Sequence, residues 1–127
     1  MSNPSSEKRV KGYHLHVYFE TSTKPQAMSL RESIEATLSK AVLGRIHEEP
    51  VAFHPRPMFQ VALPVSDLGL LLGVVMAKRG DLSVLLHPVH GDVWEEHTSD
   101  AMWLGTPLEL DKEKLRKSSG REVGSLG

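Results

Sequence analysis

Hydrophobic and polar residues alternate strictly between residues 13 and 19, and this stretch predicts a β-strand. One side of the strand is apolar and suits a protein core, because side chains in a strand point alternately to opposite faces. The other side carries His14, His16 and Tyr18. The Cβ atoms of the two histidines would lie about 7 Å apart at a strand rise of about 3.3 Å per residue. This spacing suits two ligands of one metal ion, or a metal ligand beside an acid/base group.

Two longer stretches repeat apolar residues at helical spacing. The first predicts a helix over residues 25–43, with Thr23 as a favourable N-cap and Gly44 at the C-terminal end. The second predicts a helix over residues 66–79 that stops at Gly80. Strands are predicted in the remaining segments, at 12–20, 45–53, 58–63 and 81–87, with a small extra strand at 101–104.

The predicted order of elements, β-α-β-β-α-β, is typical of the ferredoxin-like fold. We therefore predict an α+β sandwich with an antiparallel four-stranded sheet in the order 4-1-3-2 and both helices on one face. The apolar side of the first strand faces those helices. The side with the histidines is then the open face of the sheet, which a partner subunit, the C-terminal segment or a substrate must cover.

Length and composition indicate one domain and do not favour nucleic acid or a membrane as a binding partner. The 127 residues suffice for one core, which we place at residues 12–110 between polar tails at 1–11 and 111–127. The formal net charge is −1, whereas nucleic-acid or anionic-membrane partners favour a basic excess. The N-terminal residues lack the apolar segment of a secretion signal, and the apolar run at 68–77 is too short to span a bilayer. We therefore expect a cytoplasmic protein.

The chain contains seven histidines and no cysteine, so histidine, aspartate and glutamate are its candidate metal ligands. In the predicted sheet His87 ends the fourth strand beside the start of the first, and the connection that carries His54 is expected at the same edge. We therefore expect His14, His16, His54 and His87 to converge. Three or four imidazoles around an open position suit Fe(II), Zn(II) or another divalent ion.

His16, His54 and His87 are predicted as the innermost metal ligands, because His16 is the more interior histidine of the first strand. His14 is the next candidate, as a fourth ligand or as the acid/base. His90 is predicted to be a solvated loop residue. Each motif also has an ordinary explanation, since an H-x-H strand often carries two surface histidines and His-Pro is common in turns.

Four sequence motifs resemble those of the DOPA 4,5-dioxygenase family of small bacterial and fungal proteins, and they span roughly residues 12–110. The motifs are Y-H-L-H-V-Y-F, H-E-E-P-V-A-F-H-P-R-P-M-F-Q-V-A, L-L-H-P-V-H-G-D and E-H-T-S-D-A-M-W-L-G. The chain departs from the family pattern at Ala52-Phe53, where Gly-Pro is usual, and at Asp100, where a second histidine is usual. By motif position, the family's histidines correspond to His14, His16, His47, His54, His87 and His97.

The resemblance implies a ferredoxin-like fold and the extradiol cleavage of a catechol such as DOPA by dioxygen at a non-haem iron. A histidine beside such a metal would move protons, because its unperturbed pKa of about 6.5 lies near neutral pH. We assign this acid/base role to His14 and His97. We expect Tyr18, on the same face of the strand as His14, to orient the substrate.

Two other functions stay open on the sequence. The chain could be a non-catalytic, dimeric α+β module that binds a metal or a small molecule, or a dimerisation domain whose open sheet face is simply an interface. A homodimer is predicted, because an exposed sheet face needs cover and symmetric dimers are the commonest oligomers. Metal content measured together with a catechol assay separates the three functions.

Overall fold

The fold is a five-stranded antiparallel sheet with helices on both faces. The structure, a computed structural model, describes residues 7–120. The strands are β1 (Gly12–Tyr18), β2 (Val42–Leu43), β3 (Met58–Leu63), β4 (Val84–Val89) and β5 (Met102–Leu104), in the order β2-β3-β1-β4-β5. The helices are α1 (Lys24–Thr37), α2 (Leu68–Lys78), α3 (Val93–Glu96) and α4 (Lys112–Ser118). Two 3-10 turns, η2 (Thr21–Thr23) and η3 (Val65–Asp67), precede α1 and α2.

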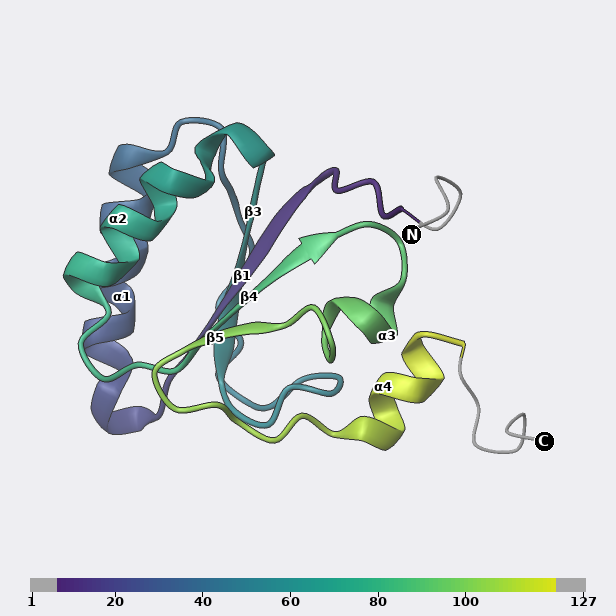
Figure 1. Cartoon of the computed structure of the whole chain (residues 1–127). Coiled ribbons are helices and arrows are strands. Elements are labelled where there is room, and N and C mark those ends of the chain that lie inside the picture. The colour runs from purple at the N-terminus through teal and green to yellow at the C-terminus, as the bar shows by residue number, and fades with distance from the viewer. Residues whose placement is uncertain (1–6, 121–127) are drawn as a thin grey trace.

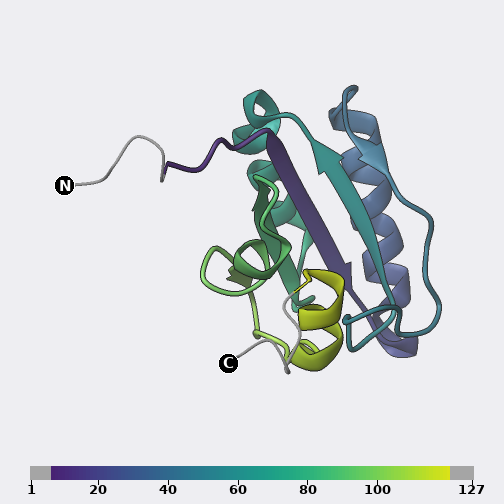
Figure 2. The same ribbon diagram turned by 90° about the vertical axis from the view of Figure 1, so that its right-hand side faces the viewer.

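The helices form two unequal layers. Figure 1 shows α1 and α2 side by side on one face of the sheet, with the shorter α3 and α4 beyond the other face. In Figure 2 the second face is turned toward the viewer, and α3 and α4 lie in front of the strands. Within residues 7–120, no helix has the length and apolar character needed to cross a membrane.

The α+β class is confirmed, but the predicted four-stranded 4-1-3-2 sheet is wrong because the small extra strand predicted at 101–104 joins the sheet as a fifth strand, in the order β2-β3-β1-β4-β5. β5 extends the sheet beyond β4, with Trp103 opposite Leu85. The predicted second strand at 45–53 is also wrong, since within that described segment only His47 forms an isolated bridge, to Met58. The strand that pairs with β3 is instead the two-residue β2.

The first helix is shorter than the predicted span of 25–43. Leu38, directly after α1, has an extended backbone with φ −107° and ψ 99°, and the chain then turns to place β2 beside β3. Further along, Pro50 has no amide hydrogen to offer a strand ladder. Residues 44–57 therefore leave the edge of the sheet as a long connection rather than as a strand.

The helix side of the sheet is a continuous apolar core. The apolar side of β1 faces α1 and α2, as the alternation predicts. Every second residue of β3 and β4 points the same way. The principal buried residues on this side are Leu15, Val17, Phe19, Leu30, Ile34, Phe59, Val61, Leu63, Leu71, Val75, Val84 and Leu86.

The opposite face is covered by the chain itself. Of the three predicted covers, the C-terminal segment is the one that the structure places there, together with residues 44–57. The backbone amide of Asp111 donates to the carbonyl of Phe53 at 2.9 Å, which ties these two segments together. The buried apolar residues on this side are Tyr18, Phe53, Met58, Leu85, Leu110 and Leu115.

This cover changes two expectations. Residues 112–118, within the predicted tail at 111–127, form α4, and Leu115 has no exposed surface. The rest of the predicted tails, at 1–6 and 121–127, lies outside the described residues. The homodimer stays a prediction, but it loses the argument that an open sheet face must be covered by a second subunit.

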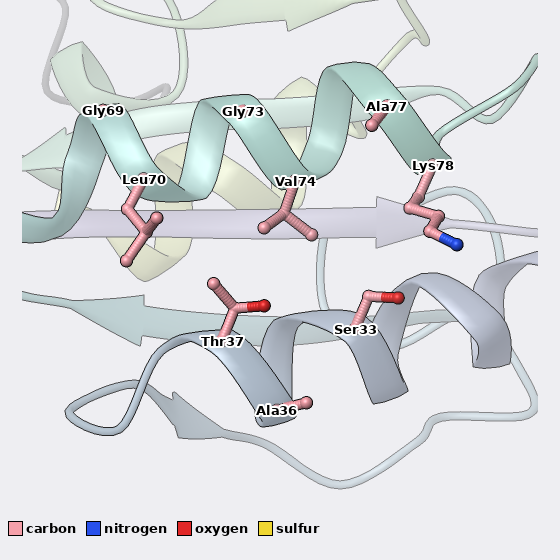
Figure 3. Close-up of a pocket in the computed structure, with 9 residues that line it drawn as sticks. All are labelled: Ser33, Ala36, Thr37, Gly69, Leu70, Gly73, Val74, Ala77 and Lys78. Carbon is pink, nitrogen blue, oxygen red and sulfur yellow. The ribbon is translucent and has the colours of Figure 1, made fainter.

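A surface groove of about 500 Å³ runs between α1 and α2 (Figure 3). It lies on the helix side of the sheet, and Lys78 is the one titratable side chain in its lining. The groove therefore offers no set of acid/base or metal-ligating groups. Its lining consists of Ser33, Ala36, Thr37, Gly69, Leu70, Gly73, Val74, Ala77 and Lys78.

Candidate metal centre

Three histidines from two neighbouring strands come together on the covered face of the sheet. His14 lies opposite His87 across the β1–β4 pair, and His16 follows His14 on the same side of β1. Each of the three offers a ring nitrogen within 4.8 Å of the other two. His16 and His87 are almost fully buried, whereas His14 is half-buried. This group could hold a metal ion.

The closest approach within this group fits a metal ion. The Nε2 atoms of His16 and His87 are 3.2 Å apart. Two imidazoles bound to one ion at about 2.0–2.1 Å have nitrogens about 3.0–3.4 Å apart, so the observed spacing suits adjacent ligands. Among residues 7–120 the Nδ1 atom of His16 has no hydrogen-bond partner, so the protein engages this ring only through Nε2. The donor set of neutral imidazoles therefore fits a divalent transition metal.

His54 reaches the same face by a route that differs from the predicted one. β3 begins at Met58, opposite Tyr18 at the end of β1, so the preceding segment starts at the far end of the strand from His14. That segment folds back over the sheet, and the ring centroid of His54 lies 4.5 Å from that of His16. The predicted convergence is confirmed, although the edge of the sheet used to predict it is wrong.

Tyr18 forms a hydrogen bond with His54. Its hydroxyl lies 2.7 Å from Nδ1 of His54, and its ring stacks against Trp103 with centroids 5.8 Å apart. Tyr18 is 1% exposed, and burial raises the pKa of its hydroxyl, so the phenol keeps its proton. Tyr18 therefore contacts a histidine of the cluster and a packing residue.

His97 joins the cluster from the end of α3. Its ring centroid lies 4.1 Å from that of His87 and 6.0 Å from that of His16. Nδ1 of His97 donates to the carbonyl of Val93 at 2.8 Å, and Nδ1 of His87 donates to the carbonyl of Pro88 at 2.9 Å. These bonds fix the orientation of both rings. All six predicted site residues are thus neighbours in the structure.

Burial keeps these imidazoles neutral. It lowers the pKa of His54 to about 3 and that of His87 to about 4, with further lowering by neighbouring imidazoles. Burial also lowers the pKa of His16 well below its ordinary value, and it lowers the pKa of His14 and His97. Neutral imidazole is the form that binds a metal, so the cluster is in its ligand form at neutral pH.

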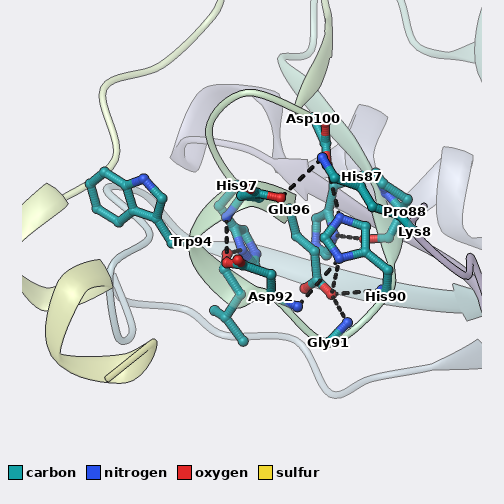
Figure 4. A network of polar contacts seen from close by, with 12 residues as sticks. Lys8, His87, Pro88, His90, Gly91, Asp92, Trp94, Glu96, His97 and Asp100 are labelled. Atoms are coloured by element: carbon teal, nitrogen blue, oxygen red, sulfur yellow. Dashed lines mark hydrogen bonds and ion pairs between the residues drawn. The ribbon is translucent and has the colours of Figure 1, made fainter. Parts of the chain in front are cut away.

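A polar network lies beside the cluster and is built largely from residues that follow β4 (Figure 4). Glu96 is 5% exposed, and its carboxylate accepts hydrogen bonds from the backbone amides of His90 and Gly91 at 2.8 and 2.9 Å. Burial acts to raise the pKa of Glu96, but these amides and the nearby imidazoles lower it overall. The side chain of His90 is 3% exposed and lies 2.8 Å from a carboxylate oxygen of Asp100, so the prediction of a solvated His90 is wrong.

Lys8 completes this network from the N-terminal segment. Its Nζ lies 2.7 Å from a carboxylate oxygen of Asp100 and 3.0 Å from one of Glu95. His90, Glu95 and Asp100 also bring ligand atoms within 4.8 Å of one another. The ammonium group of Lys8 already pairs with both carboxylates and offsets one of their two negative charges, so the histidine cluster is the better candidate for a metal.

Phe53 closes one side of the cluster. Its ring centroid lies 4.5 Å from that of His54 and 4.7 Å from that of His97. Ala52, directly before it, has φ +52°, a left-handed conformation that residues other than glycine rarely adopt. This conformation explains why glycine suits position 52. The departure from the family pattern at Ala52-Phe53 is therefore the sequence feature that comes nearest to marking this side of the cluster.

The sequence comparisons identify the family of the chain. Residues 13–114 match the sequence profile of the Dopa 4,5-dioxygenase family. An uncharacterised 21.2 kDa protein of Botryotinia fuckeliana is 31% identical over 116 residues, which cover 83% of this chain and 63% of the relative. A DOPA 4,5-dioxygenase of Amanita muscaria is 22% identical over 117 residues, which cover 86% of this chain and 51% of the relative. The chain thus spans between about half and just under two thirds of the length of these relatives.

A solved structure shares the fold. The crystal structure of a protein from Nostoc punctiforme, named provisionally as a dioxygenase, matches this chain with a TM-score of 0.83 at 34% sequence identity. The match covers 87% of this chain and 95% of the other. The matched range of the family profile spans the positions of all six predicted site residues and ends within α4. The chain therefore belongs to the Dopa 4,5-dioxygenase family.

Proposed function

We propose that this protein is a metal-dependent dioxygenase that opens the aromatic ring of a catechol, such as DOPA, by extradiol cleavage. One observation carries the proposal: two buried neutral imidazoles, His16 and His87, approach to 3.2 Å with His14 beside them, in a chain of this family. Fe(II) is the proposed native metal, and Zn(II) or another divalent ion fits the same imidazole ligands.

The proposed metal ligands are His14, His16 and His87. This set differs from the expected trio that included His54, because Nδ1 of His54 is engaged by Tyr18 and His54 falls outside the group of close ring nitrogens. Three protein ligands leave positions open for a catechol and for dioxygen. His14 is the half-buried member, so we expect the substrate to approach from its side.

The surrounding residues supply proton handling and shielding. A bound Fe(II) would bring catechol and dioxygen together and let electrons pass between them. Both atoms of dioxygen enter the product, so the reaction consumes no external reductant. His97 carries a lone pair on Nε2, because its Nδ1 donates to Val93, and it can accept a proton from a catechol hydroxyl. Phe53, which is 8% exposed, excludes water from the His97 side.

Anaerobic reconstitution with Fe(II), followed by air and either DOPA or simple catechol, tests the proposal. We expect bound iron by elemental analysis and a yellow ring-opened product. Alanine at His14, His16 or His87 should remove most of the metal. His47→Ala is the matched control and should retain metal, because His47 lies outside the cluster. Full metal occupancy in all three cluster variants would place the site elsewhere.

A second candidate function is metal or small-molecule binding without turnover. It is favoured by Asp100, which stands where the family pattern usually has a histidine and is bound to His90 and Lys8. The same reconstitution separates the two candidates. Bound metal without product from any catechol would support the binding module, whereas iron together with product excludes it.

A further inference from the structure

The histidines of the cluster differ in which ring nitrogen the protein engages. A neutral imidazole carries one N–H, and the hydrogen bonds of the ring decide which nitrogen holds it. His87 and His97 each direct Nδ1 to a backbone carbonyl, of Pro88 and of Val93. A carbonyl oxygen accepts but cannot donate. Both rings therefore hold their proton on Nδ1 and present the lone pair of Nε2, which is the form that a metal needs.

His54 has a partner of a different kind. Its Nδ1 lies 2.7 Å from the Tyr18 hydroxyl, which can donate or accept. Within residues 7–120 this is the one hydrogen bond of that hydroxyl, and Tyr18 is 1% exposed. If His54 were the donor, the hydroxyl proton would be buried without an acceptor, which is unfavourable. The hydrogen bond therefore runs from Tyr18 to His54, and the proton of the imidazole stays on Nε2.

We propose that Tyr18 is a positioning residue that holds His54 in the Nε2–H tautomer, so that His54 offers the site a hydrogen-bond donor instead of a metal ligand. The two nitrogens of an imidazole point in nearly opposite directions, so this N–H faces away from Tyr18. The ring of His54 has His16 at 4.5 Å and His97 at 6.3 Å between centroids. In the described part of the chain no hydrogen bond uses this N–H, so it is available to a ligand.

The N–H of His54 suits one class of partner, an oxygen atom that carries negative charge. Its chemical role rests on the proposed function, in which the catechol oxygens lose their protons as the substrate binds. A donor beside them stabilises the developing charge. A lone pair on the same atom would instead compete for an open position on the metal. The tautomer thus limits the ligand set to three imidazoles and keeps the remaining positions for substrates.

Long-range ¹H–¹⁵N correlation spectra of the histidine rings test the tautomers directly, in the full chain above pH 7, metal-free and zinc-loaded. We expect Nε2–H for His54 and Nδ1–H for His87 and His97. In Tyr18→Phe, the ring of His54 should show both tautomers, whereas His87 and His97 should be unchanged as internal controls. Nδ1–H on His54 in the wild-type protein would overturn the inference, and that result does not depend on whether the variant folds.

Metal binding and turnover separate this inference from the proposed function. Zinc affinity, measured by calorimetry, should stay within about threefold in Tyr18→Phe and in His54→Gln, whereas His87→Ala should lose at least about tenfold. The kcat of iron-loaded Tyr18→Phe should fall by about 10–100-fold with little change in KM. A tenfold loss of zinc affinity in His54→Gln would make His54 a ligand and refute the inference. An Nε2–H tautomer in a wild-type protein that cleaves no catechol would remove the proposed function and leave the tautomer assignment standing.

Discussion

On the helix side of the sheet, α1 and α2 pack over one cluster of fifteen buried apolar residues, whereas on the histidine side six such residues lie beside five imidazoles. The helix side is covered by helices of 14 and 11 residues. The histidine side is covered by helices of 4 and 7 residues and by the connection at 44–57. Most of the apolar stabilisation therefore lies on one face, while the other face holds groups whose charge and ligation can change.

A matched pair of leucine variants would test this division most strongly. Leu71 and Leu115 are both fully buried, in α2 and in α4. We expect Leu71→Ala to lower the free energy of unfolding by about 4 kcal/mol, and Leu115→Ala by about 2 kcal/mol, because the short α4 can relax around the cavity. Urea unfolding would measure both values. Equal losses would show that the histidine side contributes as much packing energy as the helix side.

Acidification should destabilise the metal-free protein through its buried histidines. His54 and His87 have folded-state pKa values of about 3 and about 4, against about 6.5 in an unfolded chain. Above pH 6.5 these two histidines are neutral in both the folded and the unfolded protein, so their protonation does not lower the free energy of unfolding. As the pH falls from 6.5 toward 4, these imidazoles bind protons in the unfolded state but stay neutral in the folded state. The free energy of unfolding therefore drops by on the order of a few kcal/mol.

Urea unfolding across this pH range measures the effect. His54→Gln removes one of the titrating rings, so its stability should depend less on pH than that of the wild-type protein. Saturating zinc should hold the folded state stable to lower pH, because metal binds only the neutral rings of the folded protein. Constant stability between pH 7 and pH 4 in the metal-free protein would contradict the prediction.

The smallest expected effect concerns the backbone beside the cluster. Ala52 has φ +52°, where glycine pays no steric penalty, so Ala52→Gly should stabilise the protein by about 0.5 kcal/mol. Ala36→Gly is the matched control on the exposed surface of α1, and it should destabilise by about 0.5–1 kcal/mol. Opposite shifts in thermal unfolding would bear this out, and a loss of stability in both variants would not.

The helix side of the sheet could be predicted because its signals are local. The alternation at residues 13–19 assigns the apolar side of β1, and the helical repeat locates α2 to within a few residues. The predicted end of α1 is too late because Leu38 and Ala41 continue the apolar spacing, and both still pack on the core after the helix has ended. Periodicity alone does not separate a last helical turn from an extended segment that covers the same core.

The histidine side depends on contacts between distant parts of the chain. Strand direction was enough to bring His87 beside β1, but the meeting of Tyr18 and His54, 36 residues apart, requires a connection that folds back over the sheet. The burial of His90 depends on Glu96 and the residues around it, which follow no periodic pattern. Family motifs identify the histidines, yet no motif states which nitrogen of each ring is engaged.

The pairing of β1 with β4 ties the histidine cluster to the register of the sheet. His14 faces His87 across this pair, and a slip of β4 by one residue would place Leu86 or Pro88 opposite His14 and turn His87 toward the helices. A metal ion bound by both histidines would therefore favour the native register over slipped pairings while the sheet assembles. Metal uptake would then follow correct strand pairing, and a chain with a misaligned sheet would stay without metal.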